Sequence, residues 1–155
     1  MASEFQLIEK IKALSVAKTW DEAKIEWQLQ DVVYADDDCY ETCLCGHYPI
    51  KEVCVIRNKR NGASCNVGNC CVSKFMPCSA EKIFTALKKA LKDEEKALNA
   101  ESILFAYERK IISDWDYSFY LNTWRKRKLS GKQLDNRVRI NRLILSRLVR
   151  KGSSS

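Results

Sequence analysis

All eight cysteines of this 155-residue chain lie between Cys39 and Cys78, and none falls elsewhere. In a reducing compartment, cysteines clustered on short spacings indicate a metal site rather than a set of disulfides. The alternative is that the thiols are small buried apolar groups, because free cysteine packs well in protein cores. The clustering favours a metal-binding module.

Two short motifs inside this cluster have the spacing of metal ligands. They are Cys43-Leu44-Cys45-Gly46 and Gly68-Asn69-Cys70-Cys71. A glycine beside a ligating cysteine lets backbone amides point at the sulfur, and four thiolates close a tetrahedron around zinc. The dipeptide Asn61-Gly62 lies roughly midway between the motifs and predicts a two-residue type I′ hairpin turn that brings them together. The pattern therefore predicts a zinc-ribbon-like hairpin with a structural zinc held by Cys43, Cys45, Cys70 and Cys71.

The fourth ligand is open on sequence grounds, because adjacent cysteines rarely both bind one ion. Cys70 is favoured for this position. The alternatives are His47, whose neutral imidazole is a good zinc ligand, and four further thiols: Cys39, Cys54, Cys65 and Cys78. Cys54 lies in the middle of a predicted strand, which favours a place in the core.

The motifs of several enzyme classes are missing. The sequence contains no H-E-x-x-H, no Walker A motif and no G-x-G-x-x-G. Its only histidine, His47, lies inside the cysteine cluster, where it is a poor base for a cysteine nucleophile. We therefore expect a protein without catalytic activity.

The net charge of +7 is unevenly distributed along the chain. From Arg125 to Lys151 there are eleven basic residues and a single acid, Asp135, whereas the rest holds 16 basic and 19 acidic residues. Such a concentration is typical of a surface that meets polyanions, although a solvated helix face is the simpler alternative. The residues predicted to contact phosphates are Arg57, Lys59, Arg60, Arg125, Lys126, Arg127, Lys128, Arg137, Arg139, Arg142 and Arg147.

Aromatic residues precede the basic segment, and they can either stack on bases or fill the core. We predict a core role for them: Trp115, Tyr117, Phe119, Tyr120 and Trp124.

Periodicity and capping residues predict an α+β fold with helices at both ends and strands between them. Capping boxes are expected at Ser3, Thr19 and Ser130, and further caps at Ser79 and Asn99. Helices are predicted over 5–14, 19–27, 80–98, 99–111, 114–124 and 130–150, and strands over 29–34, 53–56 and 64–67. We expect the N-terminal helices and the zinc module to form one domain, 1–78, followed by a basic helical region, 79–151, and a disordered tail, 152–155.

The cysteine segment resembles a group of small bacterial and phage proteins with a C-x-C-G start, an Asn-Gly turn and a V-G-x-x-C-V-x-x-F close. The matching stretches are Cys43–Ile50, Ile56–Lys59, Asn61-Gly62, Val67–Asn69 and Cys71–Phe75. The resemblance covers residues 24–75 well and 107–145 loosely, and it implies a zinc-binding-like core followed by a basic helical tail. It implies no activity.

Two functions follow as expectations. The first is a zinc-stabilised nucleic-acid-binding accessory protein whose contacts are mostly to phosphates, on DNA or RNA. The alternative is an adaptor or inhibitor, phage- or host-related, that docks on an acidic protein through the zinc hairpin and the last helix. No run of about 18 apolar residues occurs, and the acidic start lacks the basic region of a secretory signal, so we expect a cytoplasmic protein without a membrane partner.

Overall fold

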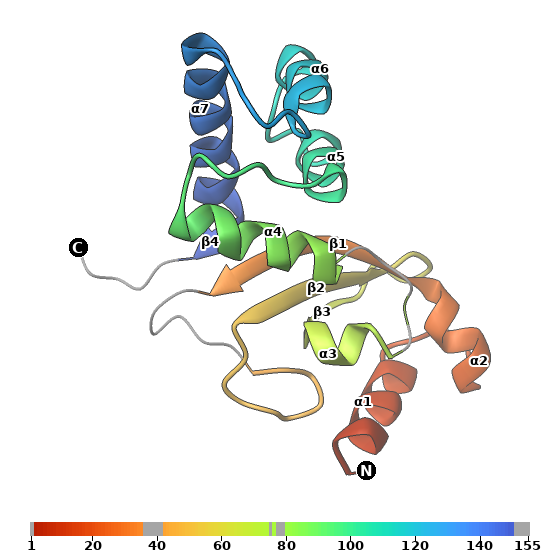
Figure 1. Cartoon of the computed structure of the whole chain (residues 1–155). Helices are drawn as coiled ribbons and strands as arrows, with labels where there is room; N and C mark the ends of the chain where they lie inside the picture. Colours follow the sequence, from red (N-terminus) through yellow and green to blue (C-terminus); the bar gives the residue numbers. More distant parts are fainter. Residues whose placement is uncertain (1, 36–41, 75, 77–79, 151–155) are drawn as a thin grey trace. The chain divides into compact units, whose positions relative to one another are not determined.

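The computed structural model describes residues 2–35, 42–74, 76 and 80–150, and it confirms the predicted α+β class (Figure 1). The chain divides into two compact units. The first comprises residues 1–80 together with 150–155, and the second comprises residues 81–149. The predicted cap at Ser79 and the predicted tail, 152–155, lie outside the described residues.

The first unit is built on a sheet in which β2 lies between β3 and β1 and pairs antiparallel with each of them. Strand β2 pairs with β1 from Glu52 to Asn58, and with β3 from Val53, opposite Gly68, to Arg57. The strands are β1 (Trp27–Ala35), β2 (Glu52–Asn58), β3 (Ser64–Gly68) and the two-residue β4 (Val149–Arg150). All three predicted strands are present, each longer than expected.

The hairpin between β2 and β3 turns where predicted, but the predicted type I′ turn is wrong. Among the turn residues only Gly62 has a positive φ, +77°, whereas a type I′ turn needs a positive φ at Asn61 as well. Asn58 closes a longer turn by donating its amide to the Ala63 carbonyl at 2.7 Å. The Asn58 side-chain oxygen also accepts the amides of Arg60 and Asn61, at 2.8 and 3.1 Å. These bonds fix the longer turn, and the Asn-Gly pair could not reveal them.

Three short helices and a 3₁₀ turn accompany this sheet. They are α1 (Ala2–Ala13), α2 (Trp20–Ala23), the 3₁₀ turn (Lys24–Glu26) and α3 (Asn69–Val72). Leu7 and Ile11 bury one face of α1, whereas Phe5 of the same helix is exposed. The predicted caps differ. Ser3 lies inside α1, and Thr19 precedes α2 without a capping bond from its side chain.

The second unit contains four helices. They are α4 (Ala80–Lys92, whose first residue belongs to the first unit), α5 (Ala100–Glu108), α6 (Asp114–Thr123) and α7 (Gly131–Leu148). Capping at Asn99 and the capping box of Ser130 with Gln133 are confirmed, and Ser113 with Asp116 adds a box that we did not predict. Helix α4 ends well before the predicted 98, because the Asp93 carboxylate accepts the Glu95 amide at 3.0 Å and turns the chain.

The buried stripe of α7 differs from the predicted one. The sequence predicts one apolar face of this helix, with arginines on another: Leu134, Val138, Leu145, Leu148 and Val149. Leu148 and Val149 are buried, whereas the other three are half-buried. The side chains that are buried on this helix recur every three or four residues: Arg137, Ile140, Asn141, Ile144 and Leu148. Two of the five are polar, which only a local network of hydrogen bonds makes tolerable.

Candidate metal centre and basic surface

Three cysteine sulfurs from two segments meet in the first unit. The sulfurs of Cys43, Cys45 and Cys71 all lie within 4.8 Å of one another. Cys43 and Cys45 precede β2 and Cys71 lies in α3, directly after β3. Because the strand register places the start of β2 beside the end of β3, the hairpin brings both segments to its open end. This arrangement can hold a metal ion.

A tight backbone turn holds Cys43 and Cys45 in place. The Cys43 amide donates to the His47 carbonyl at 2.9 Å, and the Gly46 amide donates to the Cys43 carbonyl at 2.8 Å. Gly46 has a φ of +96°, and a Cβ there would lie 3.1 Å from the Gln6 side chain. A glycine is therefore required at this position, as the Cys-x-Cys-Gly pattern suggests.

The electrostatic environment of the three thiols favours a bound cation. The Gly68 amide donates to the Cys43 sulfur at 3.2 Å. Burial acts to raise the pKa of Cys45, but hydrogen bonds from the His47 backbone and from the neighbouring thiols outweigh it, so the pKa lies below its ordinary value. The pKa of Cys71 is raised by burial and by the negative charge of its two neighbours. The protein alone therefore disfavours three thiolates together, and a bound cation would remove that repulsion.

The other predicted ligands lie elsewhere. Cys70 is exposed and stands outside the cluster, because adjacent residues on the single turn of α3 point in directions about 100° apart. His47 is exposed, Cys54 is buried within β2, and Cys65 is half-buried with a pKa raised to about 12 by burial and by Cys43. Cys39 and Cys78 are not among the described residues. Within the described part of the chain, the cluster therefore offers three thiolates and no fourth ligand.

The donor set fits zinc, although it does not complete a tetrahedron. Thiolate sulfur is a preferred ligand of zinc, and three protein ligands are the number found where a fourth position is left to another group. The two-and-two arrangement of a zinc ribbon is not what these three sulfurs form.

Four consecutive cations form an exposed loop between α6 and α7, which we call the basic segment: Arg125, Lys126, Arg127 and Lys128. None of the four makes an ion pair with another described residue. The guanidinium of Arg125 lies over the Trp124 ring, 4.8 Å from its centroid. The basic segment thus keeps its charge available to solvent.

The arginines of α7 that we expected to contact phosphates mostly bind the protein itself. Arg137 is only 7% exposed and donates to the carbonyls of Glu95 and Thr123, at 3.3 and 2.9 Å. It is therefore not one of the exposed phosphate contacts that the sequence predicted along α7, because its guanidinium is buried and is held by two backbone carbonyls. Of this set on α7, Arg147 is exposed without an ion pair to a described residue.

Arg139 and Arg142 are exposed but paired with acids. Arg139 donates to Asp116 at 2.7 Å, and Arg142 donates two hydrogen bonds of 2.7 Å to Glu94. The bond from Arg142 holds the pKa of Glu94 below its ordinary value. A phosphate would have to compete with these carboxylates for either arginine.

Near the hairpin turn, Arg57 and Lys59 are exposed, whereas Arg60 forms a 3.6 Å ion pair with the buried Glu26.

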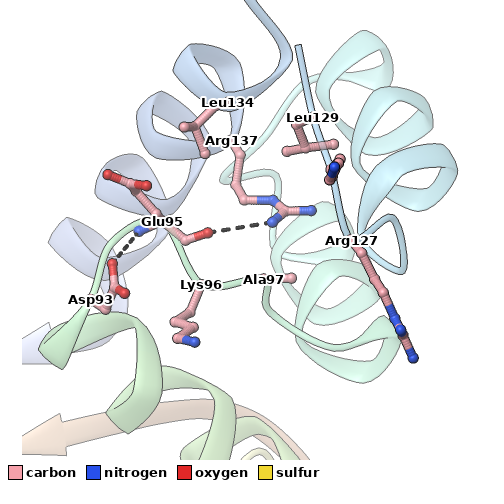
Figure 2. A pocket seen from close by; sticks show the side chains of 9 residues that line it. Asp93, Glu95, Lys96, Ala97, Arg127, Leu129, Leu134 and Arg137 are labelled. Atoms are coloured by element: carbon pink, nitrogen blue, oxygen red, sulfur yellow. Dashed lines mark hydrogen bonds between the residues drawn. The ribbon is translucent and has the colours of Figure 1, made fainter. Parts of the chain in front are cut away.

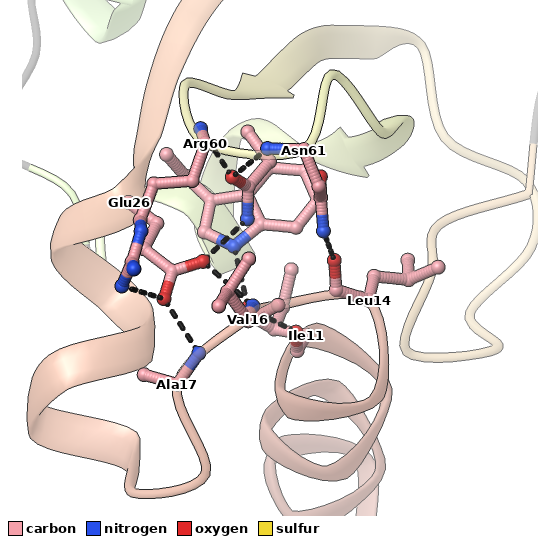
Figure 3. A network of polar contacts seen from close by, with 10 residues as sticks. Ile11, Leu14, Val16, Ala17, Glu26, Arg60 and Asn61 are labelled. Carbon is pink, nitrogen blue, oxygen red and sulfur yellow. Dashed lines mark hydrogen bonds and ion pairs between the residues drawn. The ribbon is translucent and has the colours of Figure 1, made fainter.

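Figure 3 shows Glu26 at the centre of a network that sequence reasoning missed. Its carboxylate accepts the amides of Val16 and Ala17, at 2.8 and 2.7 Å. It also accepts the side chain of Asn58 at 2.8 Å. A lone glutamate before a tryptophan gives no signal of such a role.

The aromatic residues before the basic segment do not share one environment. Tyr120 is buried, which confirms its core role, and its hydroxyl accepts the Leu98 amide at 2.9 Å. Trp115, by contrast, is 57% exposed and stacks on Phe119 at a centroid distance of 5.2 Å. The predicted core role is wrong for Trp115, whose ring presents a face to solvent.

Comparison with protein-family models, with curated proteins and with solved structures yields no match. In the described part of the chain, no helix combines the length and the apolar character that crossing a membrane requires.

Proposed function

We propose that this chain is a cytoplasmic, zinc-stabilised accessory protein that binds DNA or RNA mainly through phosphate contacts. The observation that carries the proposal is the basic segment, whose four adjacent cations are exposed and unpaired among the described residues. Long cationic side chains of this kind contact phosphates without reading sequence. The exposed face of Trp115 adds a ring on which a base can stack.

The metal has a structural role in this proposal. Cys43, Cys45 and Cys71, whose sulfurs lie together, hold zinc at the open end of the hairpin, and the ion stabilises the fold of the first unit. We assign the protein no catalytic activity.

One observation supports the adaptor function as the second candidate. An exposed tryptophan stacked on a phenylalanine is a typical anchor of a protein interface, and Trp115 on Phe119 is such a pair. The basic segment would then face an acidic protein in place of nucleic acid.

Salt-dependent binding to fluorescent single- and double-stranded oligonucleotides tests the proposal. We expect affinity to fall steeply with salt, and the double variant R125E/K126E to lose about tenfold or more in affinity and to flatten that dependence. The matched control is K89E/K92E, which makes the same charge change on exposed lysines of α4. If both variants lost the same affinity, the effect would come from net charge alone and not from the basic segment. No binding by the wild-type protein, together with a nuclease-resistant protein complex that Trp115→Ala disrupts, would favour the adaptor.

A further inference from the structure

A pocket of about 520 Å³ lies entirely within the second unit, beside the buried guanidinium of Arg137 (Figure 2). Its walls come from the loop after α4, from the basic segment and from α7. Four cationic residues line it: Lys96, Arg127, Lys128 and Arg137. Two acids also line it, so positive charge prevails in the pocket.

Arg137 has more hydrogen-bonding capacity than the protein uses. Its two terminal nitrogens donate to the carbonyls of Glu95 and Thr123, whereas its Nε is buried and has no partner within the described part of the chain. Among the described residues it also forms no ion pair. Carbonyls orient a guanidinium but carry no net charge, and a buried charge without a counter-charge is destabilising.

The acids of the pocket do not supply that counter-charge. Asp93 uses its carboxylate to accept the Glu95 amide at 3.0 Å, and neither Asp93 nor Glu95 is ion-paired with Arg137. Figure 2 shows the guanidinium pointing between the loop of residues 93–97 and the segment that carries Arg127 and Leu129. Arg137 therefore lines the same pocket as Arg127 and Lys128.

We propose that this pocket binds a dianionic phosphate group, such as inorganic phosphate or the terminal phosphate of a nucleic acid. A phosphate monoester carries close to two negative charges at neutral pH and has three strong acceptor oxygens. Guanidinium groups match this geometry with paired hydrogen bonds, and lysines add point charges. A terminal phosphate as the source rests on the proposed nucleic-acid function, whereas the chemistry of the pocket stands without it.

Titration of the full-length protein with inorganic phosphate at constant ionic strength tests the pocket, with amide chemical shifts as the readout. We expect saturable binding that weakens about tenfold or more in R127A/K128A, because charge-assisted hydrogen bonds are lost. The matched control K89A/K92A removes the same charge from exposed lysines of α4 that do not line the pocket, and we expect it to retain wild-type phosphate affinity. Equal weakening in both variants, or shifts that chloride reproduces, would overturn the pocket.

A second arm separates the two sources of phosphate. A 5′-phosphorylated single strand should bind the wild-type protein more tightly than its 5′-hydroxyl counterpart, and R127A/K128A should abolish that difference. Saturation by inorganic phosphate without binding of either strand would keep the pocket and overturn nucleic acid as its partner. Binding of both strands with no site for inorganic phosphate would keep the proposed function and overturn the pocket.

Discussion

The two ends of the β2–β3 hairpin are fastened by different chemistry. At the turn, Glu26 accepts two backbone amides and the side chain of Asn58, while its own carbonyl accepts the Lys59 amide at 2.7 Å. At the open end, the sulfurs of Cys43, Cys45 and Cys71 converge, with a backbone hydrogen bond from Gly68 to the sulfur of Cys43 and another from the His47 backbone to Cys45.

This difference indicates whether each end of the hairpin needs a bound metal ion to be stable. The carboxylate at the turn is satisfied by donors of the protein itself, so that end is complete once the chain folds. The three sulfurs repel one another as thiolates, so the cluster needs a cation that binds all three of them. The turn should therefore hold without metal, and the open end should not.

Removal of the metal ion is expected to change the stability of the two ends most unequally. We expect the wild-type protein to carry about one zinc per chain, and chelation to destabilise the first unit by on the order of 5 kcal/mol or more, because zinc binding is coupled to folding. Hydrogen exchange should accelerate at the amides of Leu44 and Gly68, next to the cluster. It should stay slow at the amide of Lys59, which is bonded at the turn. Mass spectrometry measures both metal content and exchange.

Single substitutions separate ligands from neighbours at the open end. Cys71→Ser should reduce metal content and reproduce the chelated exchange pattern, whereas Cys70→Ser should change neither, because Cys70 is exposed and outside the cluster. Metal loss in the Cys70 variant alone would contradict the three-thiol site.

The turn end is probed by Glu26→Gln, with a smaller expected effect. Hydrogen bonds to its carboxylate hold the pKa of Glu26 below its ordinary value in spite of burial. A depressed pKa stabilises the fold above the unfolded value, and this stabilisation disappears as pH falls through the folded pKa. We therefore expect the variant to be less stable at pH 7, and the gap from wild type to narrow as the pH falls below about 4.3, the ordinary pKa of a glutamate.

Denaturant unfolding across that pH range measures the gap, with Glu22→Gln as the exposed control. Metal content should be unchanged in Glu26→Gln, since the two ends are fastened independently. A variant that loses zinc together with stability would instead show that the ends are coupled through the hairpin.

Local signals in the sequence predicted the parts of this molecule that depend on neighbours along the chain. The capping residues Asn99 and Ser130 begin helices where expected, and the glycine after Cys45 adopts the positive φ that its motif requires. The three clustered thiols were predicted because β2 and β3 are joined by a short turn, so their ends must meet.

The parts that depend on distant contacts could not be predicted in this way. Arg137 and Asn141 look like the polar face of a basic helix, yet both are buried because the loop after α4 presents carbonyls to them. Glu26 is likewise buried by amides about ten residues earlier. A charge count treats a structural guanidinium and a free one alike, so the sequence overstated the phosphate-contacting surface.

The second unit contains a buried neutral amide, Asn141, that is satisfied by partners of the chain itself, as the Glu26 carboxylate is at the turn. Asn141 donates to the carbonyls of Glu94 and Lys96, both at 2.8 Å, and accepts the hydroxyl of Tyr120, while the adjacent Arg142 pairs with Glu94 at the surface. We expect Asn141→Ala to destabilise the unit by about 3 kcal/mol, because buried polar groups lose their partners.

Arg142→Ala should lower stability much less than Asn141→Ala does, because the exposed ion pair with Glu94 is screened by water. Thermal unfolding of both variants measures this difference, and addition of salt should shrink the effect of Arg142→Ala alone. Equal losses in the two variants would mean that the loop after α4 is held as much by its surface charge pair as by the buried amide. Buried hydrogen bonds within the chain would then not explain why the turn and the second unit should be stable without metal while the cysteine cluster should not.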